Sequence, residues 1–257
     1  MKIGEAIKIS KRMGLPETEA LILLSYLSGN SKEYLLSHLE EECNEKFFLF
    51  VKKRLSGYPL HYIIKKKHFF KGEFYVEEGV FIPRFETEGL VELAIDIIKR
   101  RKIGTIAEIG VGSGAVSVSI LCETNVRALG TDVSEKAIKV TRLNASNFGV
   151  ESRIDLRKGR FLEPFRSEYK NIELIISNPP YVRQGAILPE DVTFEPPEAL
   201  FGGEDGLYFY KEFFKLYDTS GKIVLMEIGD DQGEYFRKQN ITVLKDYSGK
   251  DRYILVE

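Results

Sequence analysis

The sequence predicts an α/β fold: a doubly wound, mostly parallel, seven-stranded sheet preceded by a small helical domain. From residue 105 onward, short apolar runs alternate with helix-like segments, which is typical of parallel sheets with helices on both faces. Residues 1–56 show helical periodicity throughout. Between these regions, a run rich in Phe, Ile and Val with glycine punctuation predicts a β-hairpin over Tyr62–Phe81.

The individual elements follow from periodicity and breakers. The expected strands are 105–109, 127–131, 153–157, 172–177, 222–228, 241–245 and 252–256. The expected helices in this region are 87–101, 114–123, 134–147, 207–218 and 230–238. Only the turn Asp246–Asp251 separates the last two strands, so these should pair antiparallel.

The N-terminal region predicts four helices with their own small core. The first helix ends near Gly14, and the other three cover Pro16–Leu27, Ser31–Leu39 and Asn44–Ser56. The expected core is Leu21, Leu24, Leu35, Leu36, Leu39, Phe47, Phe50, Val51 and Leu55. We therefore expect a helical domain at 1–60, a β-hairpin linker at 61–83 and a catalytic domain at 84–257. A charge split supports two modules, because residues 1–71 carry +5 and residues 72–257 carry −7.

Composition indicates a cytoplasmic enzyme without a metal site. The longest early apolar run, Leu21–Leu24, is too short to span a bilayer, and no signal-peptide pattern is present. Cys43 and Cys122 lie far apart without metal-ligand spacing, which favours reduced structural thiols. The basic run Lys65–Lys67, together with Lys71, is consistent with a solvated face and with a site for an acidic partner or RNA.

A glycine-rich loop follows the first expected strand of the sheet. Gly110, Gly112 and Gly114 alternate with Val111 and Ser113 before a helix, and glycines allow a ligand to approach the backbone closely. Dinucleotide enzymes use a similar turn, but the glycine at their third fingerprint position is missing here.

Asp132 ends the next strand. Its carboxylate is suited to accept hydrogen bonds from both hydroxyls of a ribose, although a charge at the start of the following helix is the alternative interpretation.

The four residues Asn178-Pro179-Pro180-Tyr181 directly follow a buried-strand pattern. An amide nitrogen is a poor nucleophile, so an enzyme must hold its N–H groups and aim its lone pair. The Asn178 side-chain oxygen and the Pro179 carbonyl are suitable acceptors, the two prolines stiffen them, and Tyr181 offers a flat wall. The tetrapeptide resembles the signature of S-adenosylmethionine enzymes that methylate amino groups.

Three further sequence stretches narrow the resemblance to one family of methyltransferases. They are Gly57–Ile63, Ile82–Glu88 and Glu195–Leu207, and with the motifs above they are similar to the glutamine methyltransferases of peptide chain release factors. The resemblance implies a class I methyltransferase fold, which is Rossmann-like, and an N-terminal domain that docks the release factor. It also implies methylation of the Gln in a Gly-Gly-Gln motif, which tunes translation termination.

The resemblance also implies roles for individual residues. Gly110, Gly112 and Gly114 would line the methionine part of S-adenosyl-L-methionine, Asp132 the ribose and Phe161 the adenine. Val111, Ser113 and Asn178 complete the expected cofactor contacts, and Asn178, Pro179, Pro180 and Tyr181 are expected to hold the substrate. Asn178, Pro179 and Tyr181 are also the expected catalytic residues.

Two positions depart from the family pattern. Phe85 replaces the usual Pro, which leaves the local backbone less constrained, and Glu108 replaces the usual Asp, which moves the charge one methylene outward. Four further positions keep two interpretations each: Arg84, Glu86 and Glu88 as supports of the site or as a solvated helix start, and Glu227 as a site residue or a satisfied buried carboxylate. None of the three histidines suggests a general base.

Other functions remain open at this point. An adenine-specific DNA methyltransferase is disfavoured because the catalytic part is acidic and no DNA-reading domain is present, so nucleic acid is not expected as a substrate. A ribosomal RNA guanine methyltransferase is harder to exclude, given the basic N-terminal region. A nucleotide-binding regulatory module is disfavoured by the intact Asn178–Tyr181 motif, and a dehydrogenase by the glycine spacing.

Overall fold

The computed structural model describes residues 1–257, which divide into two compact units. The first unit comprises Met1–Lys66 and Leu188–Phe194, and the second comprises Lys67–Ile187 and Glu195–Glu257. The assignment of docking, linker and catalytic roles to 1–60, 61–83 and 84–257 stays a prediction.

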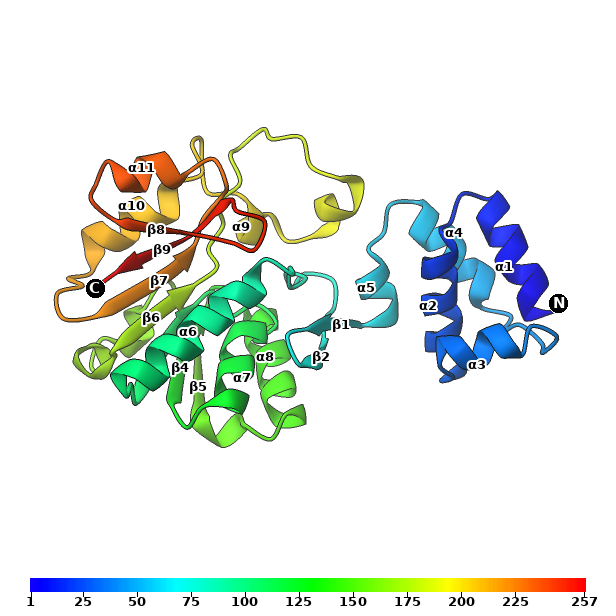
Figure 1. Ribbon diagram of the computed structural model, residues 1–257, viewed down its shortest axis with the longest axis horizontal. Helices are drawn as coiled ribbons and strands as arrows, with labels where there is room; N and C mark the ends of the chain where they lie inside the picture. Colours follow the sequence, from blue (N-terminus) through cyan, green and yellow to red (C-terminus); the bar gives the residue numbers. More distant parts are fainter. The chain divides into compact units, whose positions relative to one another are not determined.

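The first unit is helical (Figure 1, blue to cyan). Its helices are α1 (Ile3–Arg12), α2 (Glu17–Ser28), α3 (Lys32–Ser37), α4 (Phe47–Leu55) and α5 (Leu60–Ile64). Gly29 ends α2 in the left-handed conformation, and the Ser31 hydroxyl caps α3 by accepting from the Tyr34 N–H. The core is apolar and consists of Ile3, Ala6, Ile7, Leu15, Ala20, Leu21, Leu23, Leu24, Leu35, Phe47, Val51, Ile63 and Ile64.

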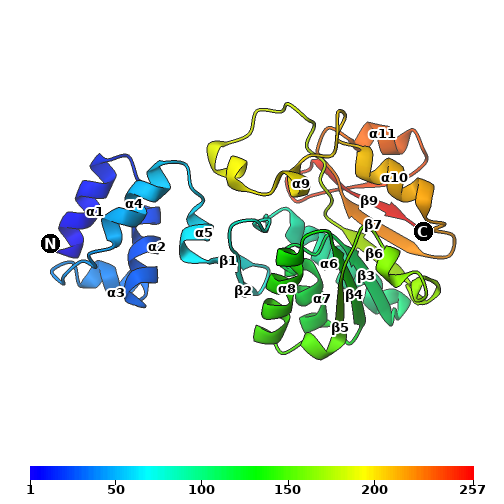
Figure 2. The same cartoon turned by 180° about the vertical axis from the view of Figure 1, so that it is seen from behind.

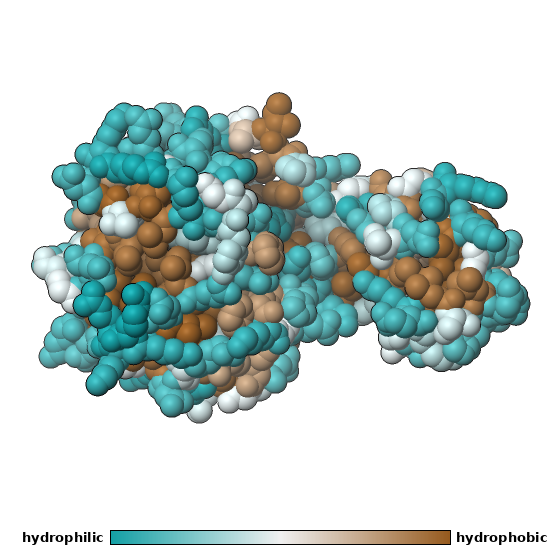
Figure 3. Space-filling model, viewed as in Figure 1, coloured by the Kyte–Doolittle hydropathy of each residue, from teal (hydrophilic) through white to brown (hydrophobic).

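The expectation that Leu36, Leu39 and Leu55 belong to this core is wrong. Their exposed fractions are 49%, 38% and 40%. Leu36 directly follows the buried Leu35, and adjacent helical side chains point about 100° apart. Leu39 lies beyond the end of α3, and Leu55 is the last residue of α4. As a result, apolar side chains reach the surface of the helical unit (Figure 3).

The segment Leu188–Phe194 completes this first unit. The Phe194 ring packs edge-on against Tyr58 with centroids 5.4 Å apart, and the Arg54 guanidinium lies 3.8 Å from the Asp191 carboxylate. Arg54 also forms a 2.7 Å ion pair with Glu19 on α2. The chain therefore leaves the second unit after Ile187, adds seven residues to the first unit and returns at Glu195.

The second unit contains the expected seven-stranded sheet. Its strands are β3 (Thr105–Ile109), β4 (Arg127–Asp132), β5 (Ile154–Lys158), β6 (Leu174–Ser177), β7 (Ile223–Glu227), β8 (Thr242–Lys245) and β9 (Asp251–Val256). The strand order is β5-β4-β3-β6-β7-β9-β8, and β9 runs in the opposite direction to the other six strands. The predicted fold class and the antiparallel pairing of the last two strands are confirmed.

Helices cover both faces of this sheet (Figure 2). One face packs against α6 (Thr87–Arg101), α7 (Ala115–Glu123) and α8 (Glu135–Asn147), and the other against α10 (Tyr208–Leu216) and α11 (Gly233–Arg237). The alternation is visible in β6, where Leu174 and Ile176 face one layer and Ile175 faces the other. Both faces are buried, which explains the nearly continuous apolar strands.

The remaining elements are short. They are α9 (Pro197–Leu200) and four 3₁₀ segments at Glu151–Arg153, Glu163–Phe165, Tyr169–Asn171 and Glu190–Phe194. No helix combines the length and apolar character needed to cross a bilayer. No group of three or more His, Cys, Asp or Glu side chains is arranged to hold a metal ion.

The β-hairpin is shorter than expected. Its strands are β1 (Lys66–Phe69) and β2 (Gly72–Tyr75), and the expected strand character from Tyr62 is wrong because α5 continues to Ile64. A short apolar run fits a helix or a strand equally well, and Pro59, with φ of −57°, favours a helix start here. The Asn144 side chain on α8 bonds both the N–H and the carbonyl of Tyr75, at 2.8 and 2.9 Å.

Candidate active site

A cavity of about 390 Å³ opens at the carboxyl ends of the central strands of the second unit. This is the edge at which doubly wound sheets bind ligands. The cavity is lined by most of the predicted site residues: Gly110, Val111, Gly112, Ser113, Asp132, Phe161, Asn178, Pro179 and Pro180. Gly114 and Tyr181 do not line it.

The glycine loop presents open backbone to this cavity. The three glycines have φ of +78°, +55° and +80°, in the left-handed region that glycine favours. A Cβ at Gly110 or Gly112 would meet no atom within 4 Å, whereas at Gly114 it would lie 2.7 Å from Thr141 Cγ2. Gly110 and Gly112 thus leave room for a ligand, and Gly114 allows α7 and α8 to pack closely.

Asp132 connects the loop to the start of α8. Its two oxygens accept hydrogen bonds from Gly112 N at 3.0 Å and Ser134 N at 2.8 Å. The cap of α8 is Ser134, whose hydroxyl accepts from the Ala137 N–H. Burial raises the pKa of Asp132, and the two main-chain N–H bonds oppose this. Each carboxylate oxygen keeps a further lone pair for a ligand hydroxyl.

Glu108 is buried below the glycine loop. Its Oε2 accepts the Ser117 N–H at 3.0 Å and the Ser117 hydroxyl. Burial raises the pKa of Glu108 to about 8, because desolvation outweighs the hydrogen bonds from Ser117. The side chain is therefore largely protonated at neutral pH.

Replacing Glu108 by Gln is expected to stabilise the protein increasingly as the pH rises. The folded protein binds the Glu108 proton more tightly than the unfolded chain, where the pKa is near 4.5, so burial of Glu108 destabilises progressively between pH 4.5 and 8. Gln keeps an acceptor for Ser117 without this titration. The gain in unfolding free energy should grow by at most ~1.4 kcal/mol per pH unit.

Denaturant unfolding of both proteins from pH 5 to 8 measures this gain. The surface variant Glu163→Gln is the control. A constant difference between Glu108→Gln and the unchanged protein across this range would contradict the expectation.

Asn178 and Pro179 line the cavity and bring two hydrogen-bond acceptors to it, the Asn178 side-chain oxygen and the Pro179 main-chain carbonyl. The Asn178 Nδ2 group donates to Thr87 Oγ1 at 3.0 Å, which fixes the side-chain amide with Oδ1 on its other side. Neither Asn178 Oδ1 nor the Pro179 carbonyl accepts a hydrogen bond from the protein. Two free acceptors in one cavity match in number the two N–H groups of a primary amide.

Tyr181 lies behind this wall. Its hydroxyl donates to Glu227 Oε1 at 3.2 Å, and its main-chain carbonyl accepts from Gln232 Nε2, also at 3.2 Å. Burial raises the pKa of Tyr181 well above its usual range. The use of its ring as a wall for the substrate stays a prediction.

The segments before and after the motif are also anchored. Arg84 forms an ion pair with the buried Glu195, whose other oxygen accepts the Ile82 N–H at 2.9 Å. Glu88 accepts the Phe70 N–H at 2.9 Å. Arg84 and Glu195 thus hold the backbone between the lining residues Phe81 and Pro83, whereas Glu88 bonds the β-hairpin at Phe70, which does not line the cavity. Phe85 is 68% exposed and does not line the cavity.

Sequence reasoning missed several lining residues. They are mainly aromatic or come from distant segments: Phe81, Pro83, Thr87, Glu198, Phe201, Tyr208 and Phe209. Pro83, Thr87, Glu198 and Phe201 were visible only as members of the stretches Ile82–Glu88 and Glu195–Leu207. No local pattern marks such residues, because their place in the cavity depends on long-range packing.

Comparison with known proteins identifies both units. Residues 8–64 match the family model described as PrmC N-terminal domain, and residues 72–193 match the Methyltransferase small domain. In structure, the second unit resembles the catalytic domain of human METTL16, solved in complex with an RNA hairpin. That match has a TM-score of 0.52 at 15% identity and covers 71% of this chain and 73% of the other, which shows a shared fold only.

Whole-length relatives carry one name. The release factor glutamine methyltransferase of Dictyoglomus turgidum is 37% identical over 253 residues, covering 93% of this chain and 90% of that protein. Those of Moorella thermoacetica and Bacillus subtilis are 34% and 36% identical, covering 98% and 94% of this chain and 96% and 91% of the relatives. Together with the motif and the cavity at the sheet edge, this similarity shows that the chain belongs to the release factor glutamine methyltransferase family.

Proposed function

We propose that this protein transfers a methyl group from S-adenosylmethionine to the side-chain amide nitrogen of the Gln in the Gly-Gly-Gln motif of peptide chain release factors. One observation carries the proposal: the free acceptors of Asn178 and Pro179 line the same cavity as the glycine loop and Asp132. The reaction would take place in the cytoplasm, and nucleic acid is not expected as a substrate.

The cavity residues fit the cofactor. Gly110 and Gly112 leave open space above their backbone, Asp132 has acceptor capacity for ribose hydroxyls, and Phe161 offers an apolar ring for the adenine. A volume of about 390 Å³ lies in the range of small-molecule sites. When bound, S-adenosylmethionine supplies an electrophilic methyl group on its sulfonium.

The protein would act by positioning. Asn178 Oδ1 and the Pro179 carbonyl accept the two N–H bonds of the substrate amide and aim its nitrogen lone pair into the cavity. After methylation the nitrogen is cationic and loses its proton to water, so no strong general base is required. The helical unit is proposed to dock the release factor, and the exposed Leu36, Leu39 and Leu55 are available for apolar contacts with it.

Replacing Asp132 by Asn is expected to weaken cofactor binding about 10- to 100-fold. A hydrogen bond to a charged group contributes about 1.5–3 kcal/mol, and the neutral amide loses one of its two acceptor oxygens. Isothermal titration with S-adenosylhomocysteine measures the change in Kd, and the exposed substitution Asp96→Asn is the control. Unchanged affinity would remove Asp132 from the proposed ribose site.

Transfer of labelled methyl groups tests the function itself. The acceptors are a purified release factor, its Gly-Gly-Ala variant, plasmid DNA and ribosomal RNA. We expect label on the unaltered release factor alone. Label on a nucleic acid would leave the cofactor in place but overturn the proposed substrate.

A further inference from the structure

Glu227 is a buried carboxylate directly behind the Asn178–Tyr181 motif. We propose that Glu227 is a positioning residue, which orients Tyr181 directly and Asn178 through Thr87. In this arrangement the Asn178 side-chain oxygen and the Pro179 carbonyl face the substrate amide. This inference rests on the proposed function and adds a group that the reaction itself does not touch.

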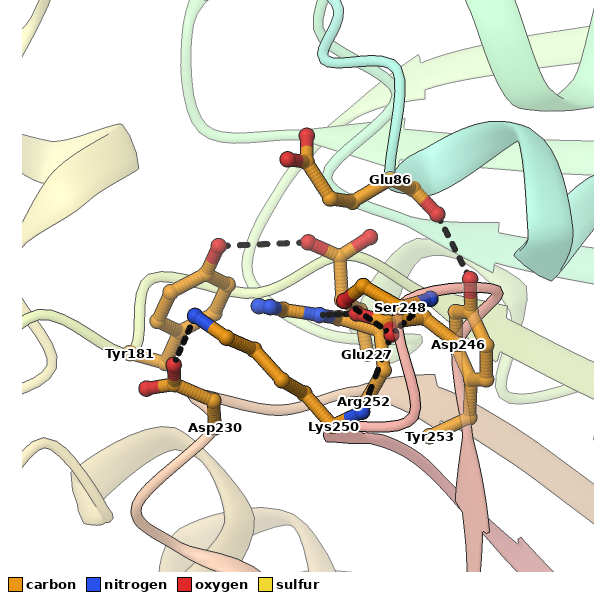
Figure 4. Close-up of polar contacts among 9 residues, drawn as sticks. All are labelled: Glu86, Tyr181, Glu227, Asp230, Asp246, Ser248, Lys250, Arg252 and Tyr253. Atoms are coloured by element: carbon orange, nitrogen blue, oxygen red, sulfur yellow. Dashed lines mark hydrogen bonds and ion pairs between the residues drawn. The ribbon is translucent and has the colours of Figure 1, made fainter.

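The position of Glu227 connects it to the motif. It is the last residue of β7, next to the strand that leads into Asn178, and it is 0% exposed. Figure 4 shows the Tyr181 hydroxyl and the Glu227 carboxylate pointing toward one another, and the hydroxyl donates to Oε1 at 3.2 Å. The Tyr210 hydroxyl holds the main-chain carbonyl of Glu227 at 2.6 Å.

The second oxygen of Glu227 is unusual. Oε2 is buried and accepts no hydrogen bond of ordinary geometry, although the nearby Thr87 hydroxyl lowers the pKa of Glu227. An unsatisfied buried carboxylate oxygen is costly, and the Thr87 hydroxyl, which already interacts with Glu227, is a donor that can satisfy it. Glu227 then accepts hydrogen bonds from two hydroxyls, that of Tyr181 and that of Thr87.

The direction of these bonds decides the orientation of Asn178. An ionised carboxylate only accepts, so both hydroxyls must donate toward it. Thr87 Oγ1 then offers its lone pair to Asn178 Nδ2, at 3.0 Å, and the Asn178 Oδ1 atom is left for the substrate. A protonated Glu or a Gln at position 227 has a hydrogen-bond donor of its own. The Thr87 hydroxyl is then no longer forced to donate toward residue 227, and the orientation of the Asn178 amide is less strongly fixed.

The charged surroundings tune the ionisation of Glu227. Arg252 on β9 favours the ionised form, while Glu86 before α6 opposes it. Burial outweighs the favourable contacts and raises the pKa of Glu227 to about 7. The tyrosines facing it from other elements are Tyr181, Tyr210 and Tyr253, each with its pKa raised above the usual range by burial. Burial thus moves the pKa of Glu227 toward neutrality and the pKa values of the three tyrosines away from it.

The first test compares Glu227→Gln with the unchanged protein and with the surface variant Glu163→Gln. We expect kcat for release factor methylation to fall at least 10-fold at pH 8, with the Kd for S-adenosylhomocysteine unchanged within twofold. The rise of kcat with pH through an apparent pKa near 7 should disappear in Glu227→Gln. An unchanged kcat and pH profile in this variant would overturn the proposal.

A second pair of variants separates positioning from loss of packing. Thr87→Ser keeps the hydroxyl and should retain kcat within about threefold, whereas Thr87→Val keeps the shape and should lose activity like Glu227→Gln. Equal activity of Thr87→Ser and Thr87→Val would exclude the route through Thr87.

Crystal structures make the test independent of turnover. In Glu227→Gln the Tyr181 and Asn178 side chains should shift relative to those of the unchanged protein, and identical positions would overturn the proposal. If the unchanged protein methylates no release factor, the proposed function fails, and these two structures still decide the role of Glu227.

Discussion

Replacing Asn178 by Ala is expected to lower kcat for release factor methylation by about 10²–10³-fold, or about 2.7–4 kcal/mol of activation free energy, by analogy with removal of one oriented polar group. In the proposed mechanism, the Asn178 side chain supplies one of the two acceptors that hold the substrate amide. Its loss frees one N–H bond and lets the nitrogen lone pair turn away from the methyl donor. Thr87 also loses its 3.0 Å contact.

The measurement is steady-state methyl transfer to a purified release factor. Because Asn178 is also an expected cofactor contact, binding of S-adenosylhomocysteine is measured in parallel, and its Kd should rise far less than kcat falls. Asn147→Ala, at the exposed end of α8, is the matched control and should keep normal turnover. Near-normal kcat in Asn178→Ala would refute the amide-holding role of the motif.

Replacing Gly206 by Ala is expected to destabilise the protein and impair catalysis together. Gly206 has φ of +74°, and a Cβ there would collide with the Tyr181 carbonyl oxygen and lie 2.7 Å from Gln232 Nε2. The left-handed backbone costs a non-glycine residue about 1–2 kcal/mol, and overpacking adds about 1–3 kcal/mol, for a total of about 2–5 kcal/mol. The Asn178–Tyr181 segment must move to relieve the collision.

A second glycine separates the two contributions to this loss. Gly249 has φ of +81° and nothing within 4 Å of its ideal Cβ, so Gly249→Ala carries the backbone strain without the collision. Thermal unfolding and kcat are measured for both variants. Gly249→Ala should lose about 1–2 kcal/mol of stability and no activity. Equal losses in both variants would show that the collision with Tyr181 is unimportant.

Much of the second unit was predictable because local signals and global packing agree there. The helix expected at 87–101 is α6, and the strand expected at 105–109 is β3. The 15-residue periodicity of α6 leaves one interpretation, and the five-residue β3 was placed by the glycine turn and helix that follow it. Errors arose where the apolar run was short. Ile63 and Ile64 fit a strand pattern but end a helix, and Leu36 is exposed although it directly follows the buried Leu35 in the sequence.

The candidate site divides in the same way. The glycine loop, Asp132 and Asn178 follow three strands whose carboxyl ends share one edge, so sequence order predicts their proximity. Thr87 lies 91 residues from Asn178, and Glu227 lies 46 residues from Tyr181. No local pattern links such pairs. For Glu227 the sequence was equally consistent with a role in the site and with a buried carboxylate whose hydrogen bonds are satisfied. Only the packed structure shows that one of its oxygens lacks a partner.

The route of the chain through Leu188–Phe194 bears on how this protein can be divided. The Asn178–Tyr181 motif and the return at Glu195 flank a segment whose packing partners, such as Tyr58 and Arg54, belong to the helical unit. Removing residues 1–66 would strip these contacts from a loop that begins at the candidate active site. The helical unit is thus not an exchangeable module, and a chimera with a relative's N-terminal region must also exchange residues 188–194.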